Sequence, residues 1–417
     1  MTSHVRVIER ALEVAAANDH QAWVTLNQHA VGQYQRTRPN GSENDRMLEG
    51  LPCGIKDNID VAGLPTGSGS AYTSATATRD ADVVRALRDA GAAIIGKNAM
   101  HEVAYGATGM VSATEPAQNP RAAGRIPGGS SSGSAAAVAA GDVPFAIGTD
   151  TGGSVRVPAA CCGVVGLRPT TGTLSSAGVR PLSPTLDTIG VLAASVDIAA
   201  VVWCAVSGTA PPPPGPDAPR RVGVVVDAHF APSSPAIAEA VRSATALLER
   251  HGSTVRPVQL GWGEAALSIY THIVGVEAAR GHRDRLSERS PLFQPSTYQR
   301  LTAGGRISRQ AYDEALRRRV QIADDLLRLF DHHDVLICPT TPITAPKRGQ
   351  TTADVGGRAI EVGQALVAYT APWSVTGAPA LAVPVSCDPH GLPTSIQILG
   401  RPGDEIGVLN TGLVIER

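Results

Sequence analysis

The sequence has almost no excess of charge of either sign. Lys and Arg together number 36 and Asp and Glu together number 37, so the formal net charge of the 417 residues is −1. A nucleic-acid-binding surface needs clustered basic residues that attract phosphates, and a nearly neutral composition does not favour one. We therefore expect no nucleic-acid partner.

Long hydrophobic runs are also missing. The longest apolar stretches, such as residues 191–206, are interrupted by Ser195 and Asp197 and are too short for the roughly 20 residues of a membrane-spanning helix. Residues 1–6 contain no apolar core of the kind found in a secretory signal. We therefore expect a cytoplasmic protein with no membrane partner.

Cysteines are few, and their spacing excludes two kinds of site. No pair has the CxxC spacing of redox and zinc motifs, and the only close pair is adjacent. We expect no disulfide framework and no metal site, and we interpret the cysteines as buried thiols. They are Cys53, Cys161, Cys162, Cys204, Cys338 and Cys387.

Glycine and proline, in contrast, are abundant, with 44 and 31 residues. Average proteins contain roughly 7% glycine and roughly 5% proline. Disorder would explain the excess only if apolar content were low, and hydrophobic residues make up 43% of the chain. The composition predicts a folded protein with a large core, many tight turns and unusual backbone conformations.

Helical and apolar segments alternate along the chain, which predicts an α/β fold. Residues 1–45 are expected to form a helical segment, and residues 82–90 an amphipathic helix followed by a buried strand at 92–96. Residues 208–220 are rich in proline and cannot join a sheet. This stretch is either a domain boundary or a surface excursion within one large domain.

A second unit repeats the alternation more clearly. Residues 221–227 predict a strand, residues 236–250 a helix and residues 253–260 a second strand. Two strands joined through a helix are usually parallel. Pro257 predicts that the second strand lies at an edge or ends early.

Two Gly/Ser segments are candidates for a binding or catalytic site. Residues 128–134 (GGSSSGS) run directly into a small-residue helix, so they present backbone N–H groups and hydroxyls to a polar ligand. A nucleotide site is not favoured, because neither GxGxxG after a strand nor GxxxxGK[ST] is present. A flexible linker is the alternative.

The second segment places two glycines before Ser154. Gly152 and Gly153 allow a sharp turn that exposes the Ser154 hydroxyl and aims successive N–H groups at one point, as an oxyanion hole requires. Val155 and Arg156 follow Ser154, so this is not the GxSxG hydrolase motif. A glycine-rich turn capped by serine is the structural alternative.

A serine nucleophile needs a base, and two residues are candidates. His101 is the histidine closest to a Gly-rich, apolar context. Lys56 lies in the apolar, strand-like residues 51–60, where burial would lower its pKa. A salt bridge between Lys56 and Asp57 or Asp60 is the structural alternative.

Three segments together resemble the motifs of the amidase signature family. Residues 54–58 (GIKDN) resemble its lysine motif, residues 128–131 (GGSS) its first serine motif, and residues 148–159 (GTDTGGSVRVPA) its nucleophile motif. The resemblance extends from about residue 51 to residue 405. Shorter pieces that also fit are CG at 162–163, GLRPT at 166–170, LDTIG at 186–190, CPTTP at 338–342, GLP at 391–393 and GRP at 400–402.

The resemblance implies a Ser–cis-Ser–Lys triad. Ser154 would be the nucleophile, Ser130 the bridging serine after a cis peptide bond, and Lys56 the base. The N–H groups implied to form the oxyanion hole are those of Thr151, Gly152, Gly153 and Ser154. Motif positions that usually support the site are occupied by Ser131, Asp150 and Arg156.

The resemblance also implies a fold and an activity. The fold is a single α/β/α domain over residues 1–417, with a large mixed, mostly parallel sheet flanked by helices, so residues 208–220 become a surface excursion. The implied activity is hydrolysis of the C–N bond of a small carboxylic amide, without a metal or an organic cofactor. The expected partners are a small-molecule substrate and, at most, a second copy of the chain.

Other activities remain open for the same motifs. The glutamine-hydrolysing component of glutamyl-tRNA amidotransferase, its A subunit, shares them and releases ammonia from glutamine for a partner subunit. In this chain, however, Trp373 and Ser374 stand where an Asn-Leu type pairing is more usual. The triad would also cleave a carbamate (urethane), an ester or an aryl-acylamide. A binding protein on an inactive scaffold would lack a catalytic residue, and all three are present.

The substrate pocket is the least determined part of the site. Ordinary core or loop packing is the alternative for every candidate wall. The candidates are Met100, His101, Tyr105, Trp373, the loop 175–183 and the region 341–373.

Overall fold

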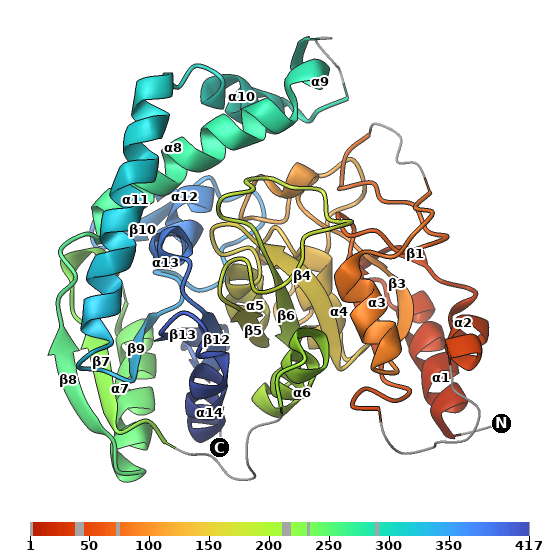
Figure 1. Cartoon of the computed structure of the whole chain (residues 1–417), viewed down its shortest axis with the longest axis horizontal. Helices are drawn as coiled ribbons and strands as arrows, with labels where there is room; N and C mark the ends of the chain where they lie inside the picture. The colour runs from red at the N-terminus through yellow and green to blue at the C-terminus, as the bar shows by residue number, and fades with distance from the viewer. Residues whose placement is uncertain are drawn as a thin grey trace.

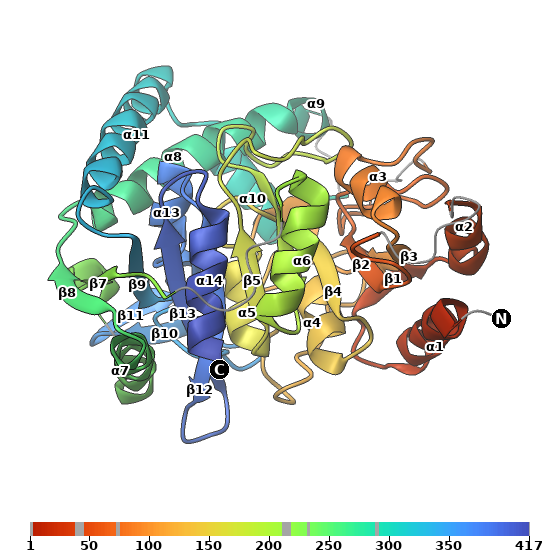
Figure 2. The same cartoon turned by 60° about the horizontal axis from the view of Figure 1, so that its bottom comes forward.

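A computed structural model of the chain describes residues 3–37, 46–71, 76–210, 218–231, 234–287 and 292–416. At its centre lies a sheet of 11 strands in the order β1-β3-β2-β4-β6-β5-β12-β13-β9-β7-β8, and β10 and β11 form a separate two-stranded sheet. Figures 1 and 2 show the large sheet crossing the molecule with helices on both of its faces.

The bounds of the elements are as follows. The strands are β1 (Trp23–Leu26), β2 (Pro52–Lys56), β3 (Ala93–Asn98), β4 (Phe145–Asp150), β5 (Val165–Arg168), β6 (Thr188–Ala193), β7 (Arg221–Val225), β8 (Thr254–Val258), β9 (Val335–Pro339), β10 (Thr352–Val355), β11 (Arg358–Glu361), β12 (Ala380–Cys387) and β13 (Pro393–Gly400). The α-helices are α1 (Ser3–Ala17), α2 (Ala30–Thr37), α3 (Asp82–Asp89), α4 (Ser132–Ala140), α5 (Arg156–Cys162), α6 (Val196–Ser207), α7 (Pro235–Arg250), α8 (Gly263–Gly281), α9 (Arg283–Ser287), α10 (Pro295–Gly304), α11 (Arg309–Leu329), α12 (Val362–Val367), α13 (Ala371–Thr376) and α14 (Glu405–Glu416).

Alternating side chains along the strands supply a hydrophobic core on each face of the sheet. Along β4, Phe145 and Ile147 belong to the core that contains Trp203 of α6, whereas Ala146 belongs to the core that contains Ala136 of α4. Helices α3, α6, α7 and α14 contribute to the first core. Helices α1, α2, α4 and α5 contribute to the second, so the large sheet is sandwiched between two helical layers.

A third core lies among the helices of the C-terminal half. Helix α8 packs against α10, α11 and α13, and Figure 1 shows α8 and α10 across the top of the molecule and α11 running down its left side. Aromatic side chains join α13 to the start of α8 and to the segment after β7, because Trp373 of α13 packs between Phe230 and Trp262. This helical group covers the end of the sheet where the Gly/Ser turns lie.

The predicted large mixed sheet is confirmed, but the prediction that it is mostly parallel is wrong. Six of the ten pairings between neighbouring strands are antiparallel. Parallel neighbours need a crossover connection, usually a helix, and β7 and β8 are parallel across α7 as predicted. The central strands β5 and β6, and β12 and β13, are joined by segments without a helix and therefore run antiparallel.

Three further expectations concern Pro257, the N-terminal segment and the Pro-rich stretch. Strand β8, which contains Pro257, is an edge strand as predicted. The segment 1–45, predicted to be helical, contains the four-residue strand β1 between α1 and α2, which is too short for a visible alternation of apolar residues. In the Pro-rich stretch 208–220, residues 211–217 lie outside the described residues.

Two further expectations concern the burial of the cysteines and the presence of membrane-spanning helices. Five cysteines are buried as predicted, whereas Cys387 is exposed because it ends β12 at the surface. In the described ranges, no helix combines the length and apolar character needed to cross a membrane.

The packing of α4 against the sheet generates a testable prediction. The N–H of Gly133 donates to Ala99 O, and a Cβ on Gly133 would lie 2.4 Å from Ala22 O and from Ala99 N. We expect Gly133→Ala to lower the free energy of unfolding by about 1–3 kcal/mol, measured by urea denaturation, because the neighbouring backbone has to move.

The matched control is Gly281→Ala at the end of α8, where nothing lies within 4 Å of an added Cβ. Alanine is the better helix former, so this variant is expected to retain or slightly raise stability. Equal stability losses in the two variants would contradict the close packing of α4.

Candidate active site

Lys56 ends strand β2 and is completely buried. Its Nζ donates to Ser130 Oγ at 2.7 Å, to Thr149 Oγ1 at 2.7 Å and to Thr149 O at 3.3 Å. Neither salt bridge considered as an alternative is formed: Asp57 pairs with Lys97 at 3.2 Å, and among the described residues no ion pair joins Lys56 to Asp60. The Lys56 amine is therefore directed at a serine hydroxyl and at β4.

The environment of Lys56 favours a neutral amine. Burial lowers the pKa of Lys56 to about 7, although the carboxylates of Asp150 and Asp187 act in the opposite direction. A lysine with a pKa near neutrality can accept and return a proton, which an ordinary surface lysine does not do readily at that pH.

Ser130 lies in the loop before α4, next to the turn that carries Ser154. The Gly129–Ser130 peptide bond is cis, as expected. Ser130 O accepts a hydrogen bond from His101 N at 3.0 Å, and Ser131 N donates to Ser154 O at 3.1 Å. The Ser131 hydroxyl also donates to Thr149 O at 3.3 Å. These backbone contacts bring the two serine motifs side by side.

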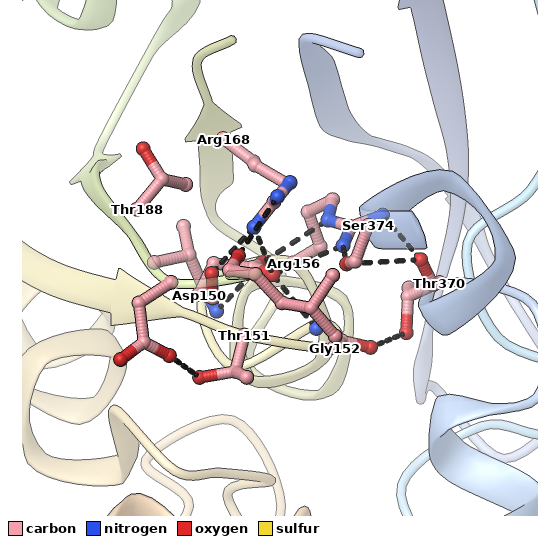
Figure 3. A network of polar contacts seen from close by, with 12 residues as sticks. Asp150, Thr151, Gly152, Arg156, Arg168, Thr188, Thr370 and Ser374 are labelled. Atoms are coloured by element: carbon pink, nitrogen blue, oxygen red, sulfur yellow. Dashed lines mark hydrogen bonds and ion pairs between the residues drawn. The ribbon is translucent and has the colours of Figure 1, made fainter. Parts of the chain in front are cut away.

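Asp150 organises the turn between β4 and Ser154. Its carboxylate accepts from Gly153 N at 2.8 Å and from Val155 N at 3.2 Å. Arg156 Nη2 donates to it at 3.0 Å and Arg168 Nη1 at 3.2 Å, and all three charged side chains are fully buried. Figure 3 shows this network around the turn.

The charges of this network determine the protonation state of Asp150. Burial raises the pKa of Asp150, but the guanidinium groups of Arg156 and Arg168 outweigh that effect and hold the pKa well below its ordinary value. Arg156 also reaches the C-terminal half through Thr370 O, Gln397 Oε1 and Ser374 Oγ. The nucleophile turn is thereby fixed from two sides.

The two glycines of the turn are required by close approaches. Gly153 has φ of +134°, and a Cβ on it would lie 2.1 Å from Thr370 Oγ1. A Cβ on Gly152 would lie 2.4 Å from the hydroxyl of Tyr270, and Gly152 O accepts from Thr370 Oγ1 at 2.6 Å. Any larger side chain would displace these neighbours.

The predicted oxyanion hole needs one correction. The N–H of Gly153 donates to Asp150, so it is not available to a substrate oxygen. The N–H groups of Thr151, Gly152 and Ser154 have no acceptor among the described residues. No hydrogen bond joins the hydroxyls of Ser154 and Ser130 in the part of the chain that the structure describes, and catalytic hydrogen bonds often tighten only in the substrate complex.

Core packing accounts for two of the four predicted pocket residues. Trp373 is fully buried against Phe230 and Trp262, and Met100 is buried in the same core, so core packing accounts for both. His101 is buried, and burial, with the charges of Arg300 and Lys56, lowers its pKa to about 3, so it stays neutral. Tyr105 is partly buried at the edge of this core.

A cavity of about 270 Å³ has in its wall Thr149, which accepts a hydrogen bond from Lys56, and Thr151, the first residue of the nucleophile turn. Its wall is formed by part of the predicted loop 175–183 together with residues before and after that loop. The residues that line it are Asn58, Ala104, Thr149, Thr151, Thr171, Gly172, Leu174, Ser176, Val179, Arg180, Pro181, Leu182, Pro184, Asp187, Thr188 and Ile189.

Several site residues were missed by sequence reasoning. Tyr270 of α8, Thr370 before α13 and Gln397 of β13 all contact the turn or its arginine, although they are more than 100 residues away in the sequence. Gln397 offered a signal, because it is a polar residue inside the otherwise apolar stretch 396–399. Tyr270 and Thr370 offered none. Within the described ranges, no group of three His, Cys, Asp or Glu side chains could hold a metal ion.

Known proteins resemble the chain along nearly its whole length. A family model described as Amidase matches residues 6–409. The A subunit of the glutamyl-tRNA(Gln) amidotransferase of Picosynechococcus sp. is 33% identical over 414 residues, covering 89% of this chain and 84% of the relative. The AtzE subunit of the 1-carboxybiuret hydrolase of Pseudomonas sp. is 36% identical over 387 residues, covering 88% and 84%.

Solved structures agree with these relatives. A crystal structure of an amidase superposes with a TM-score of 0.91 at 32% identity, covering 100% of this chain and 96% of that one. The A subunit of the glutamyl-tRNA(Gln) amidotransferase of Thermotoga maritima superposes with a TM-score of 0.82 at 28% identity, covering 99% and 91%. With its motifs, its mixed sheet and these relatives in agreement, the chain belongs to the amidase family, the amidase signature enzymes.

Proposed function

We propose that the protein is an amidase that hydrolyses the C–N bond of a small carboxylic amide through an acyl-enzyme on Ser154. The observation that carries the proposal is the contact of 2.7 Å between Nζ of the buried Lys56 and Ser130 Oγ. A lysine with a pKa of about 7 in that position is a competent base for a serine relay.

The proposed reaction begins with attack of Ser154 Oγ on the amide carbonyl. The Ser154 proton passes to Ser130 Oγ as the Ser130 proton passes to Lys56 Nζ, and a C–O bond forms. The proton then returns along the same path to the amide nitrogen, the C–N bond breaks and the amine leaves. Water attacks the resulting ester by the same relay and releases the carboxylic acid and free Ser154.

The developing oxyanion needs fixed donors, and the backbone turn can supply them. The N–H groups of Thr151, Gly152 and Ser154 are the candidates, since Gly153 N is held by Asp150. Donors that are already oriented stabilise the transition state without the cost of reorganising water. The buried Asp150–Arg156–Arg168 network keeps this turn in place.

A second candidate function is supported by the names of the relatives. Several are A subunits of a glutamyl-tRNA(Gln) amidotransferase, which suggests glutamine hydrolysis within a larger assembly. Strict dependence on glutamine, together with copurification of a second subunit, would favour it. Turnover of aryl or alkyl amides by the lone chain would favour the amidase. Carbamates and esters belong in the same panel, because the same triad would attack their carbonyl groups.

Substitution of the nucleophile and the base tests the triad. We expect Ser154→Ala to abolish amide turnover, by at least about 10⁴-fold, because no acyl-enzyme can form. We expect Lys56→Ala to lower kcat by about 10²–10⁴-fold, the usual contribution of a general base. The measurement is the steady-state rate with an aryl amide, after a thermal melt has shown that each variant is folded.

The matched control is Lys347→Ala, which removes an exposed lysine and should leave the rate unchanged. A near wild-type kcat in Lys56→Ala would refute the lysine assignment.

The pKa of Lys56 predicts the pH dependence of the reaction. Its folded value of about 7 lies below its ordinary value, so Lys56 is protonated and inactive below that pH and neutral above it. We therefore expect kcat/KM to rise with pH and to level off above an apparent pKa of about 7. A profile that is flat between about pH 5 and pH 9 would contradict a titrating base in this range.

A further inference from the structure

The cavity beside Lys56 touches both halves of the catalytic machinery. Thr149, which accepts from Lys56 Nζ, lines the cavity together with Thr151, the first residue of the nucleophile turn. Asn58 also lines it, and Asn58 Nδ2 donates to Thr149 Oγ1 at 3.2 Å. The cavity wall therefore includes a residue that holds the base and the residue that begins the nucleophile turn.

The proton relay connects the cavity wall to the leaving group of the substrate. The proton returns to the leaving nitrogen from Ser130, which is held by Lys56 Nζ. Lys56 Nζ lies 2.7 Å from both Ser130 Oγ and Thr149 Oγ1, so one amine joins the proton donor of the leaving nitrogen to a residue of the cavity wall.

The size of the cavity exceeds what ammonia requires. One water molecule occupies about 30 Å³ of liquid, and ammonia is of similar size. A volume of about 270 Å³ is therefore much larger than ammonia requires. A primary amide would leave most of it unused.

The cavity is lined by charged side chains of both signs, Asp187 and Arg180, and by hydroxyl and amide groups. Asp187 lines it and, among the described residues, forms no ion pair with Lys, Arg or His; its carboxylate accepts from Thr151 Oγ1 at 2.5 Å, Leu182 N at 2.8 Å and Ser183 N at 3.0 Å. Asn58 Oδ1 is buried and has no hydrogen-bond donor among the described residues. An unsatisfied acceptor beside a carboxylate favours a ligand with N–H donors.

The wall of the cavity is held in a fixed shape by a second carboxylate. Glu277 of α8 accepts from Ser183 Oγ at 2.6 Å and from Thr185 N at 3.1 Å, and also from the Thr185 hydroxyl. Tyr312 of α11 donates to the same carboxylate at 2.7 Å. Because Asp187 and Glu277 restrain the same loop from two sides, the cavity is already formed before a ligand binds.

We propose that this cavity receives the leaving amine and that the preferred substrate is an N-substituted amide whose amine portion carries a further N–H or ammonium group that reaches Asp187. This inference rests on the proposed amidase function and specifies its substrate class. Arg180 also lines the cavity, and its carbonyl accepts from Asn58 Nδ2 at 3.3 Å. Burial raises the pKa of Asp187 to about 6, so its carboxylate is charged at pH 8.

The test compares four amides of one carboxylic acid, assayed at pH 8 with the full chain. They are the primary amide, the N-butyl amide, the N-(4-aminobutyl) amide and the N-(3-carboxypropyl) amide. We expect kcat/KM to be at least about tenfold higher for the aminobutyl than for the butyl amide, since a hydrogen bond to a charged group contributes about that factor. The primary and carboxypropyl amides should be the poorest substrates.

Substitutions in the cavity test whether Asp187 causes the preference for the aminobutyl amide. Asp187→Asn removes the charge and should bring the aminobutyl-to-butyl ratio close to one. Thr185→Val is the matched control, because it loosens the same loop at Glu277 but leaves the charge of Asp187, so the ratio should persist. If Asp187→Asn does not fold, Val179→Phe fills the cavity and should lower the butyl-to-primary ratio at least about tenfold.

The opposite results would overturn the inference. One is a preference for the primary amide. Another is a preference for the carboxypropyl amide, which would make Arg180 the dominant charge of the cavity. The third is an aminobutyl-to-butyl ratio that is unchanged in Asp187→Asn. Labelling of Ser154 with a fluorophosphonate distinguishes a wrong substrate class from a wrong amidase function. Ser154 that is labelled and hydrolyses amides without these preferences refutes only the substrate class. Ser154 that is neither labelled nor active with any amide refutes the amidase function as well.

Discussion

The buried ion pairs of Asp150 with Arg156 and Arg168 are the interaction on which the candidate site depends. All three side chains are fully buried, and each arginine donates to the same carboxylate. Removing one partner of such a group leaves an uncompensated buried charge, which typically costs about 3–5 kcal/mol. Because the same carboxylate also accepts from Gly153 N and Val155 N, the geometry of the nucleophile turn is tied to this charge balance.

The same network joins parts of the chain that are far apart in sequence. Arg168 ends β5, whereas Arg156 begins α5 and contacts Thr370, Ser374 and Gln397 of the C-terminal half. Lys56 approaches from the opposite side, on β2, which pairs with β4. Strand β4 thus carries Thr149 toward the base and Asp150 toward the arginines, so adjacent residues of one strand serve the two halves of the site.

Local sequence signals predicted the parts of the site that local structure creates. The glycines before Ser154, the Gly/Ser segment before α4 and a lysine in an apolar stretch each had a physical reason within a few residues, and the family motifs supplied their order. The parallel unit β7-α7-β8 was equally predictable, since the helix between two strands determines their direction.

Long-range packing determined what the sequence could not predict. The antiparallel centre of the sheet depends on which strands become neighbours, and the alternation of apolar residues carries no information about that order. The sequence around Trp373 does not distinguish a residue that lines a pocket from one that fills a core. Its contacts with Phe230 and Trp262 show that it fills a core. The family resemblance placed Gly153 N in the oxyanion hole. Its hydrogen bond to Asp150 forms only in the folded turn, so the sequence contains no sign of it.

The most direct test of the account is to identify the atom that carries the acyl group during turnover. The chain is mixed with an activated aryl amide, quenched with acid within the first turnover, digested and analysed by mass spectrometry. The account predicts that the acyl mass appears on the peptide that contains Ser154 and is absent from Ser154→Ala. An acyl group on another residue, or turnover that persists in Ser154→Ala, would contradict it.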